Sequence, residues 1–502
     1  MTKKDMRRDF LKLKKSLIFI IFIFSILFFS QSIYTKVFYE GSQNNWGNVY
    51  KEYNLDKVSY RNMVSYRIKE NEKEYDETTD LIIHFNEQKK EEFKVLGNYR
   101  ITEALYIPNL DNKVYGNASA NFSLTHHKIK LLAEKGSFLY PGSKIGDFTI
   151  SFWVYPQASY EGNELFSYYS PAYNRSTDKI EFTGFKAYLI DNVVYIKFDN
   201  LFSLKGIPVS FVINSGIELD IVKWQHIAFT FNKYNGKFTC YKNNHKTGIF
   251  YFTDSGKENG TTLEGIIPNE LRTYLIIGQS FFGNIDEFVI EKKVEDDFDL
   301  TQYRREGGYL LSKVLDLDFY STKVLKFETK SVTENKTSIS IYYRIMEDFY
   351  DENDQIIPWK IYDENSVIKG RYLQWKIVFY PSYEGKYTPQ LIDLILTILP
   401  NYPPSPPNNV NYRLLPNSQV EIYWNKNIES DVIGYYVYYG TKSKQYICND
   451  AVEGQSPIFT EKNSIIITLR PETEYFVAIK AVDNAYYPQR SDFSKEIVFR
   501  TK

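Results

Sequence analysis

The chain has 502 residues, about three times the usual length of one domain, so we expect roughly three domains. Its 61 Lys and Arg residues balance 62 Asp and Glu residues, and this balance gives no global reason for nucleic-acid binding. Aromatic residues make up 17%, with 44 Tyr and 36 Phe, but only two Cys occur. Because Tyr and Phe favour strands, the composition predicts a large, mostly β, multidomain protein. It excludes a disulfide scaffold, a Cys-rich zinc protein and a disordered chain.

A basic flank and a short apolar run open the chain. Lys and Arg are frequent in the first 15 residues, and residues 17–29 are apolar except for Ser25. This layout is typical of a secretory signal, and spanning a bilayer usually takes about 20 apolar residues. Residues 1–32 are therefore predicted to be a signal peptide cleaved after Ser32 or, alternatively, an uncleaved N-terminal anchor. Either reading predicts an exported protein of the periplasm, cell envelope or cell surface, and membrane contact is expected only through this segment if it stays uncleaved.

The two cysteines, Cys240 and Cys448, lie far apart in the sequence, in segments assigned to different domains. A disulfide between them is not expected, and each is predicted to be a free thiol that packs as a small apolar residue. The exported domains must then be held together by core burial, which their size permits.

Strand signals begin after a polar region. Residues 33–78 are rich in charge and show no clear strand pattern, so they are predicted to form a polar stalk, partly disordered. In residues 147–156, Phe, Ile and Val alternate with Thr, Ser, Trp and Tyr, which predicts a strand with one apolar face. Further strands are separated by turn residues such as Asn235 and Gly236. This pattern predicts an antiparallel β-sandwich.

Four motifs between residues 81 and 292 carry a family resemblance. They are Phe148-Thr149-Ile150-Ser151-Phe152-Trp153, Trp224-Gln225-His226-Ile227-Ala228, Phe238-Thr239-Cys240-Tyr241, and Gly283-Asn284-Ile285-Asp286-Glu287. In this order they resemble the laminin-G-like domains of the concanavalin A-like jelly rolls. The usual Gly of the third motif's turn is replaced by Asn244. The resemblance implies a jelly roll over residues 79–295.

Two more β modules are predicted downstream. Residues 305–400 resemble an accessory β-sandwich found beside other modules in bacterial surface proteins, with a Gly370-Arg371-Tyr372-Leu373-Gln374 motif. A Pro-rich linker, residues 401–407, is expected to be extended and semi-rigid. Residues 408–502 resemble a fibronectin type III domain, in which Trp424 is the core Trp and Tyr475 the tyrosine corner. The predicted fold class is therefore all-β, a jelly roll plus two further antiparallel sandwiches.

Catalytic patterns are missing from the sequence. It has no G-x-S-x-G, H-E-x-x-H, phosphate-binding Gly loop or C-x-x-C. The jelly-roll β-glucanases carry acids at alternating positions of one strand, but here Val289 stands between Glu287 and Glu291. Such a spacing is about 13 Å at roughly 3.3 Å per residue, too far for a direct carboxylate pair. We therefore predict no catalytic residue and no cofactor. Calcium at Asp286 remains possible, although a single acid does not make a site.

Binding is the favoured functional reading, because sugars stack on exposed aromatic rings. The candidate ligand-binding residues are Trp153, Tyr155, Tyr168 and Tyr169. The sequence thus predicts non-catalytic recognition of a glycan or a surface protein, and no nucleic-acid partner. Two alternatives stay open: a structural or spacer protein of the envelope, and a carbohydrate-active enzyme with an unrecognised jelly-roll site.

Overall fold

The computed structural model describes residues 35–158, 162–174, 178–270 and 272–502. Within these ranges every regular element is a strand, apart from one 3₁₀ turn, η1 (Lys90–Glu92). The strands pair antiparallel, which confirms the predicted all-β class. The chain forms two compact units, one of residues 69–306 with 381–387, and one of the remaining residues.

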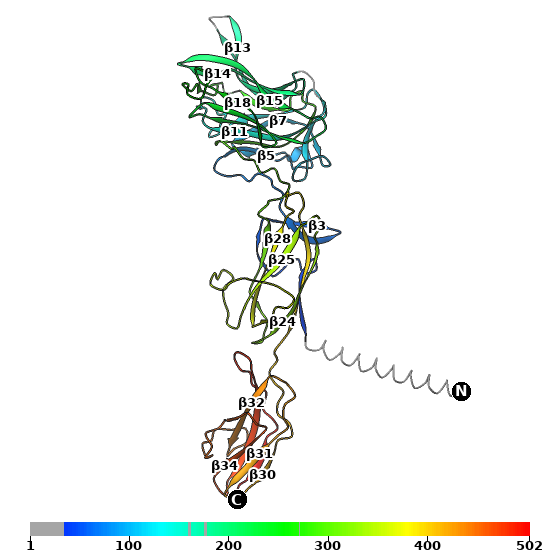
Figure 1. The fold of residues 1–502 in the computed structure, drawn as a ribbon, viewed down its shortest axis with the longest axis vertical. Helices are drawn as coiled ribbons and strands as arrows, with labels where there is room; N and C mark the ends of the chain where they lie inside the picture. The colour runs from blue at the N-terminus through cyan, green and yellow to red at the C-terminus, as the bar shows by residue number, and fades with distance from the viewer. Residues whose placement is uncertain (1–34, 159–161, 175–177, 271) are drawn as a thin grey trace, which may run out of the picture. The chain divides into compact units, whose positions relative to one another are not determined.

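The first of these units is a jelly roll of two sheets, drawn with labelled strands such as β5, β11 and β13 in Figure 1. The nine-stranded sheet consists of β5 (Thr79–Ile83), β6 (Leu96–Gly97), β8 (Ile107–Asn109), β9 (Ser119–Phe122), β11 (Phe148–Pro156), β16 (Gln225–Asn232), β17 (Lys237–Lys242), β18 (His245–Tyr251) and β21 (Gly283–Glu291). Its order is β18-β17-β16-β11-β21-β5-β6, with β9 beside β21 and β8 beside β9.

The eight-stranded sheet of the jelly roll consists of β7 (Tyr99–Leu105), β10 (Lys128–Ala133), β12 (Glu164–Asn174), β13 (Lys179–Ile190), β14 (Val193–Leu204), β15 (Ile207–Glu218), β19 (Glu264–Gly265) and β20 (Tyr274–Ile277). Its order is β15-β14-β13-β12-β20-β10-β7, with β19 beside β14. Apolar side chains from both sheets form one continuous core. Because successive residues of a strand point to opposite faces, each core strand sends alternate residues into it.

A second sandwich, which contains β1 and β29, belongs to the other compact unit and has two six-stranded sheets. One contains β1 (Lys36–Gly41), β3 (Leu55–Tyr60), β4 (Met63–Ile68), β24 (Lys323–Val332), β27 (Ile368–Lys369) and β29 (Gln390–Leu399). The other contains β2 (Val49–Tyr53), β22 (Gly308–Ser312), β23 (Leu315–Asp316), β25 (Ser338–Met346), β26 (Lys360–Ile361) and β28 (Tyr372–Tyr380).

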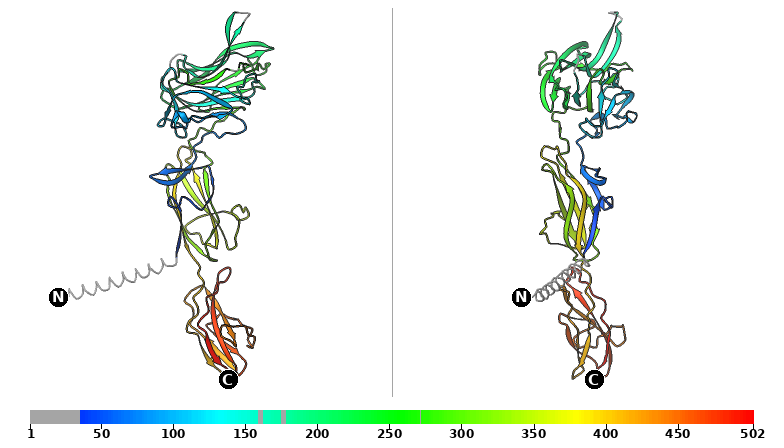
Figure 2. Two further views of the ribbon diagram at one scale, coloured as in Figure 1. Left: turned by 180° about the vertical axis from the view of Figure 1, so that it is seen from behind. Right: turned by 90° about the vertical axis from the view of Figure 1, so that its right-hand side faces the viewer.

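The predicted stalk over residues 33–78 is wrong, because β1 to β4 are strands of this sandwich. β1 pairs with β29 along its whole length, and β2 pairs with β22. Figure 2 shows the blue N-terminal strands beside the yellow and green strands of the same sandwich. The charged residues misled the prediction because β2 and β3 are edge strands of antiparallel sheets, in which only one face needs to be apolar. Tyr66 and Ile68 on β4 are fully buried.

The C-terminal sandwich has seven strands in two sheets. The first is β30 (Asn411–Leu414), β31 (Gln419–Tyr423) and β34 (Ser464–Thr468); the second is β33 (Ile458–Thr460), β32 (Val432–Gly440), β35 (Glu474–Asp483) and β36 (Ile497–Arg500). Trp424 and Tyr475 are buried in its core, and the Tyr475 hydroxyl accepts a hydrogen bond from the Arg470 N–H at 3.3 Å. These features fit the predicted tyrosine corner, while the fibronectin type III assignment stays a prediction.

Two sequence predictions concern export and redox state. The predicted signal or anchor, residues 1–32, lies outside the described residues. In the part of the chain that the structure describes, no helix is long and apolar enough to cross a membrane. Cys240 is buried, Cys448 is half-buried, and both are free thiols, as predicted.

Candidate functional site

A cleft of about 450 Å³ lies on the outer face of the nine-stranded sheet of the jelly roll. Strands β11, β16 and β21 form its floor, and the segments 71–76 and 295–300 form its walls. The floor residues are Ser151, Trp153, His226, Glu287, Val289 and Glu291. Apart from Glu295, both wall segments lie outside the predicted jelly-roll range of 79–295, and the structure places them in the same compact unit as the sheet.

Alternation along β11 determines which side chains reach the cleft. Phe148, Ile150, Phe152 and Val154 enter the core, as the sequence pattern predicts. Ser151 and Trp153 therefore lie on the outer face, where both line the cleft.

A β-bulge in β21 gives this strand two consecutive outer residues. Trp153 pairs with Asp286 and Ser151 pairs with Val289, so Phe152 alone faces both Glu287 and Phe288. Glu287 has a φ of 48°, in the left-handed region, which is a conformation that bulges use. Ile285 and Phe288 both enter the core although two residues separate them. The bulge thus brings an extra acid to the outer face.

Asp286, the predicted calcium candidate, is fully buried. Its carboxylate accepts backbone N–H bonds from Val114 at 2.8 Å and from Glu287 at 3.1 Å. Burial raises its pKa well above the usual value, as does the charge of Glu287, while the backbone N–H bonds act in the opposite direction. Asp286 therefore fastens the loop that contains Val114 to the inner strand β21 of the sheet, and its binding of calcium is an untested prediction.

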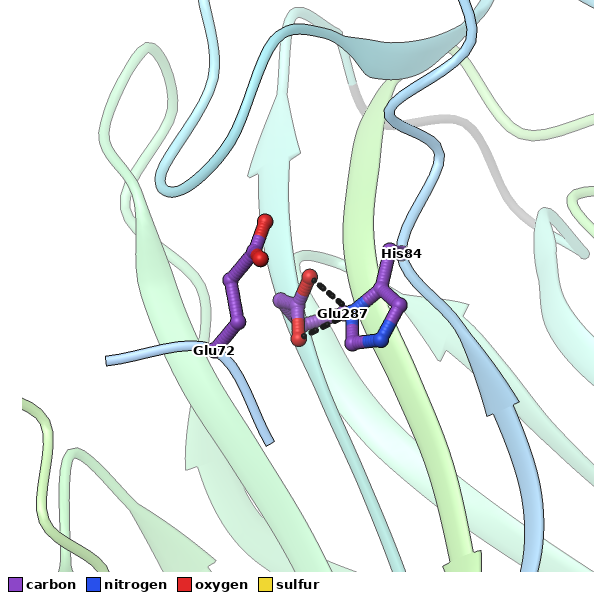
Figure 3. Close-up of side chains that lie close together, drawn as sticks. All are labelled: Glu72, His84 and Glu287. Carbon is purple, nitrogen blue, oxygen red and sulfur yellow. Dashed lines mark hydrogen bonds and ion pairs between the residues drawn. The ribbon is translucent and has the colours of Figure 1, made fainter. Parts of the chain in front are cut away.

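Glu287 lies between two other ionisable side chains, Glu72 and His84 (Figure 3). The His84 Nδ1 is 2.8 Å from Glu287 Oε1 and 3.0 Å from Oε2. Burial raises the pKa of Glu287, and the hydrogen bond and charge of His84 only partly offset this rise. Burial lowers the pKa of His84, but the hydrogen bond that its ring makes to Glu287 and the charges of Glu287 and Glu72 outweigh this effect, so that the pKa is raised.

Glu291 is the last residue of β21, also lines the cleft, and has its own partners. Lys73 Nζ lies 2.7 Å from its Oε1, and Lys293 Nζ lies 3.4 Å away. Glu287 and Glu291 thus face one cleft but have different partners, His84 for Glu287 and lysines for Glu291. This arrangement differs from that of a glycosidase, in which two carboxyl groups flank one bond.

Aromatic rings surround His226 on the cleft floor. The rings of Trp153 and Phe298 lie 5.4 Å and 5.0 Å from the imidazole, and Tyr115 packs edge-on against Trp153 at 6.1 Å. Burial lowers the pKa of His226 to about 3. Its Nδ1 is buried and has no hydrogen-bond partner within the described part of the chain. The imidazole is therefore neutral near pH 7.

The structure separates the four predicted ligand-binding aromatics. Trp153 is half-buried and lines the cleft. Tyr155 is half-buried and packs on Trp224 at 5.4 Å. Tyr169 lies on β12 of the other sheet, where its hydroxyl donates to Asp199 at 2.9 Å.

Tyr168 was wrongly predicted as a ligand contact. It is fully buried in the jelly-roll core, and its hydroxyl donates to the Leu139 carbonyl at 3.0 Å. Adjacent strand residues point to opposite faces, so Tyr168 and Tyr169 could not both be exposed. Of the four candidates, Trp153 is the one that lines the cleft.

Several cleft residues carry no signal in the sequence. Glu72 lies in a charged run that reads as stalk, and Tyr115 and Phe298 come from irregular segments. Nothing in a local pattern indicates that these segments fold over one strand face. His226 was expected to pack inside a strand, and it does so, but its place on the cleft floor required the sheet order.

The cleft and the two sheets define a jelly roll of the kind found in lectins and carbohydrate-acting enzymes. A model of the concanavalin A-like lectin/glucanases superfamily matches residues 136–295, which confirms the predicted jelly roll over that range. No curated protein matches the chain.

Solved structures with local similarity include three from different settings. Domain 4 of AbnA, a GH43 extracellular arabinanase from Geobacillus stearothermophilus in complex with arabinotriose, is 15% identical at a TM-score of 0.24, covering 43% of this chain and 95% of that domain. A heptameric SAP-like pentraxin from Limulus polyphemus is 12% identical at 0.21, covering 44% and 80%. The botulinum neurotoxin serotype D binding domain is 11% identical at 0.29, covering 81% and 85%. All three TM-scores are below 0.5, so these likenesses say nothing about what this chain binds.

Proposed function

We propose that this chain is an exported bacterial envelope or surface protein whose jelly roll recognises a carbohydrate without catalysis. The observation that carries the proposal is Trp153, a half-buried indole on the floor of a cleft that also holds carboxylates and a neutral imidazole. Sugar rings present apolar faces to aromatic rings and hydroxyl groups to polar side chains, and this floor offers both. The superfamily match over residues 136–295 supports the same reading.

A glycan array probed with the full chain tests this proposal. We expect binding to a restricted set of glycans, and the variant Trp153→Ala should weaken it about tenfold, which corresponds to roughly 1.4 kcal/mol of lost stacking. Tyr234→Ala is the matched control, because Tyr234 is 92% exposed on a turn of the same unit and does not line the cleft.

Two outcomes would reject the proposal. If the folded chain binds no glycan at high micromolar sugar concentrations, this result would favour a surface-protein ligand or a structural role. Binding that Trp153→Ala leaves unchanged would place the glycan elsewhere on the molecule.

The enzyme alternative has one observation in its favour. Glu287 is buried in the cleft with a raised pKa, a property that general acids of glycosidases share. Turnover of a polysaccharide that Glu287→Gln abolishes would establish hydrolysis and refute the non-catalytic proposal. We expect no turnover, because the second acid of the cleft, Glu291, is paired with Lys73.

A further inference from the structure

Three side chains that could ligate a metal ion converge at one end of the cleft. Glu72 comes from the wall segment, His84 follows β5, and Glu287 lies in the bulge of β21. One ligand atom of each lies within 4.8 Å of those of the other two. Figure 3 shows Glu287 between the other two side chains. Residues from three separate segments thus present one nitrogen and two carboxylates to a common point.

Three carboxyl groups crowd around this point. The carboxyl groups of Glu72, Asp286 and Glu287 are neighbours, and those of Asp286 and Glu287 are 0% and 5% exposed. The nearby Lys73 is paired with Asp76 and Glu291. Glu72 Oε1 accepts a hydrogen bond from the uncharged side-chain amide of Asn86 at 2.6 Å. The His84 imidazole also faces this group, with its Nδ1 2.8 Å from Glu287 Oε1, and buried carboxylates are costly to keep charged without a cation beside them.

We propose that Glu72, His84 and Glu287 bind one divalent transition-metal ion of the zinc type. An imidazole nitrogen with two carboxylates suits zinc or manganese, whereas calcium and magnesium prefer sets made of oxygen alone. Ligand atoms around a zinc ion with bonds of about 2.1 Å lie roughly 3.4 Å apart in tetrahedral geometry. The His84 and Glu287 atoms are already as close as that, at 2.8 Å.

Glu72 completes the set by a small movement. Its side chain is half-buried and extends from an irregular wall segment, so it can approach the other two ligands without disturbing a strand. The ion then ties the wall of the cleft to its floor, because Glu72 and Glu287 both line the cleft. The metal site does not depend on the proposed carbohydrate recognition, and it can be measured without a glycan.

The test uses the full chain purified in detergent, stripped with a chelator and dialysed against zinc chloride. We expect one equivalent of zinc by mass spectrometry of the metal, and a visible d–d spectrum after substitution with cobalt. Glu72→Gln and His84→Gln should each weaken zinc binding at least tenfold and alter the cobalt spectrum. Because Glu72 is half-buried in an irregular segment, its variant should fold, as near-ultraviolet circular dichroism would verify.

Matched controls should retain the bound zinc. Glu164→Gln changes a half-buried glutamate on β12, and His245→Gln changes an exposed histidine on β18, both outside the cluster. The rings of His126 and His127 also lie side by side. A double variant with both changed to Asn should still bind zinc, which would exclude this pair as the zinc site. Absence of bound zinc in the folded chain, binding unaffected by Glu72→Gln and His84→Gln, or binding of calcium in preference to zinc would each overturn the proposal.

Discussion

In the central strands β11 and β21 of the nine-stranded sheet, the two faces are both largely buried, but with opposite chemistry. On the inner face, Phe152 and Phe288 pack in an apolar core. On the outer face, Thr149, Asn284 and Asp286 are each 0% exposed, yet they are polar and hydrogen-bonded. A polar strand face is usually solvated, but here irregular chain segments cover it. The comparison shows that the alternation of a strand identifies its two faces without telling which of them meets water.

The inner face should be the more costly to disturb. Phe152 is 1% exposed, and its ring packs against Phe166 and Phe288 at 5.8 Å and 5.6 Å. Phe152→Ala should lower the free energy of unfolding of the jelly roll by about 3–5 kcal/mol, through lost burial and the cavity left behind. Hydrogen exchange of peptides from β11 and β21 measures this unit separately from the sandwiches. Tyr234→Ala should change it by less than about 0.5 kcal/mol. Equal effects of the two variants would contradict the inner-face assignment.

On the outer face, the polar network should carry a smaller cost. Asn284 accepts a bond from Asn121 at 2.8 Å and donates to the Ser119 hydroxyl at 2.7 Å. Asn284→Ala leaves these buried partners unsatisfied, so we expect a loss of about 1–3 kcal/mol in the same exchange measurement. Asn117→Ala, at an exposed position of the covering loop, is the control and should be nearly neutral. A neutral Asn284→Ala would mean that water reaches this face.

Acid should weaken the outer face through His226. Its pKa is lowered to about 3 by burial, whereas the unfolded chain takes up the proton near pH 6.5. The stability that this histidine contributes is therefore complete above pH 6.5 and is lost as the pH falls toward 3. Between pH 7 and pH 5 we expect a loss of about 2 kcal/mol, since one pKa unit corresponds to roughly 1.4 kcal/mol.

The variant His226→Gln should remove that part of the pH dependence, measured as the difference in unfolding free energy from the unaltered chain at each pH. His245→Gln, on an exposed strand position, should keep the full dependence. An identical pH profile for His226→Gln and the unaltered chain would show that the imidazole is not buried in the neutral form.

The sequence predicts the jelly-roll sheets well because their signals are local. The alternation of β11 follows from side-chain direction alone, and the motif around Asp286 marks the strand beside it. The site is less predictable, because Glu72, Tyr115 and Phe298 reach the cleft from segments without regular structure. The bulge at Glu287 also depends on pairing with β11, so strand periodicity alone could not reveal that Asp286 and Glu287 share the outer face.

The predicted stalk failed for a related reason. Within residues 36–68, β1 and β2 pair with strands hundreds of residues away and so lack a nearby hairpin partner that would mark them, whereas β3 and β4 form a hairpin with each other. The charges that suggested a stalk are concentrated after Ile68, in the segment that includes the cleft wall. A polar segment can therefore be structural when distant strands complete its sheet.

The pairing of β1 with β29 has a consequence for biogenesis. Just after β1, the backbone N–H of Ser42 donates a hydrogen bond of 3.0 Å to the carboxylate of Asp393, which lies 351 residues further along the chain. The sandwich that contains β1 and β29 thus cannot close until the whole jelly roll, which lies between these strands in the sequence, has been synthesised and has emerged. Loop-closure entropy grows only slowly with length, so this delay is kinetic more than energetic. In the meantime β1 and β2 lack their partners β29 and β22, which is when the chain would most need a chaperone.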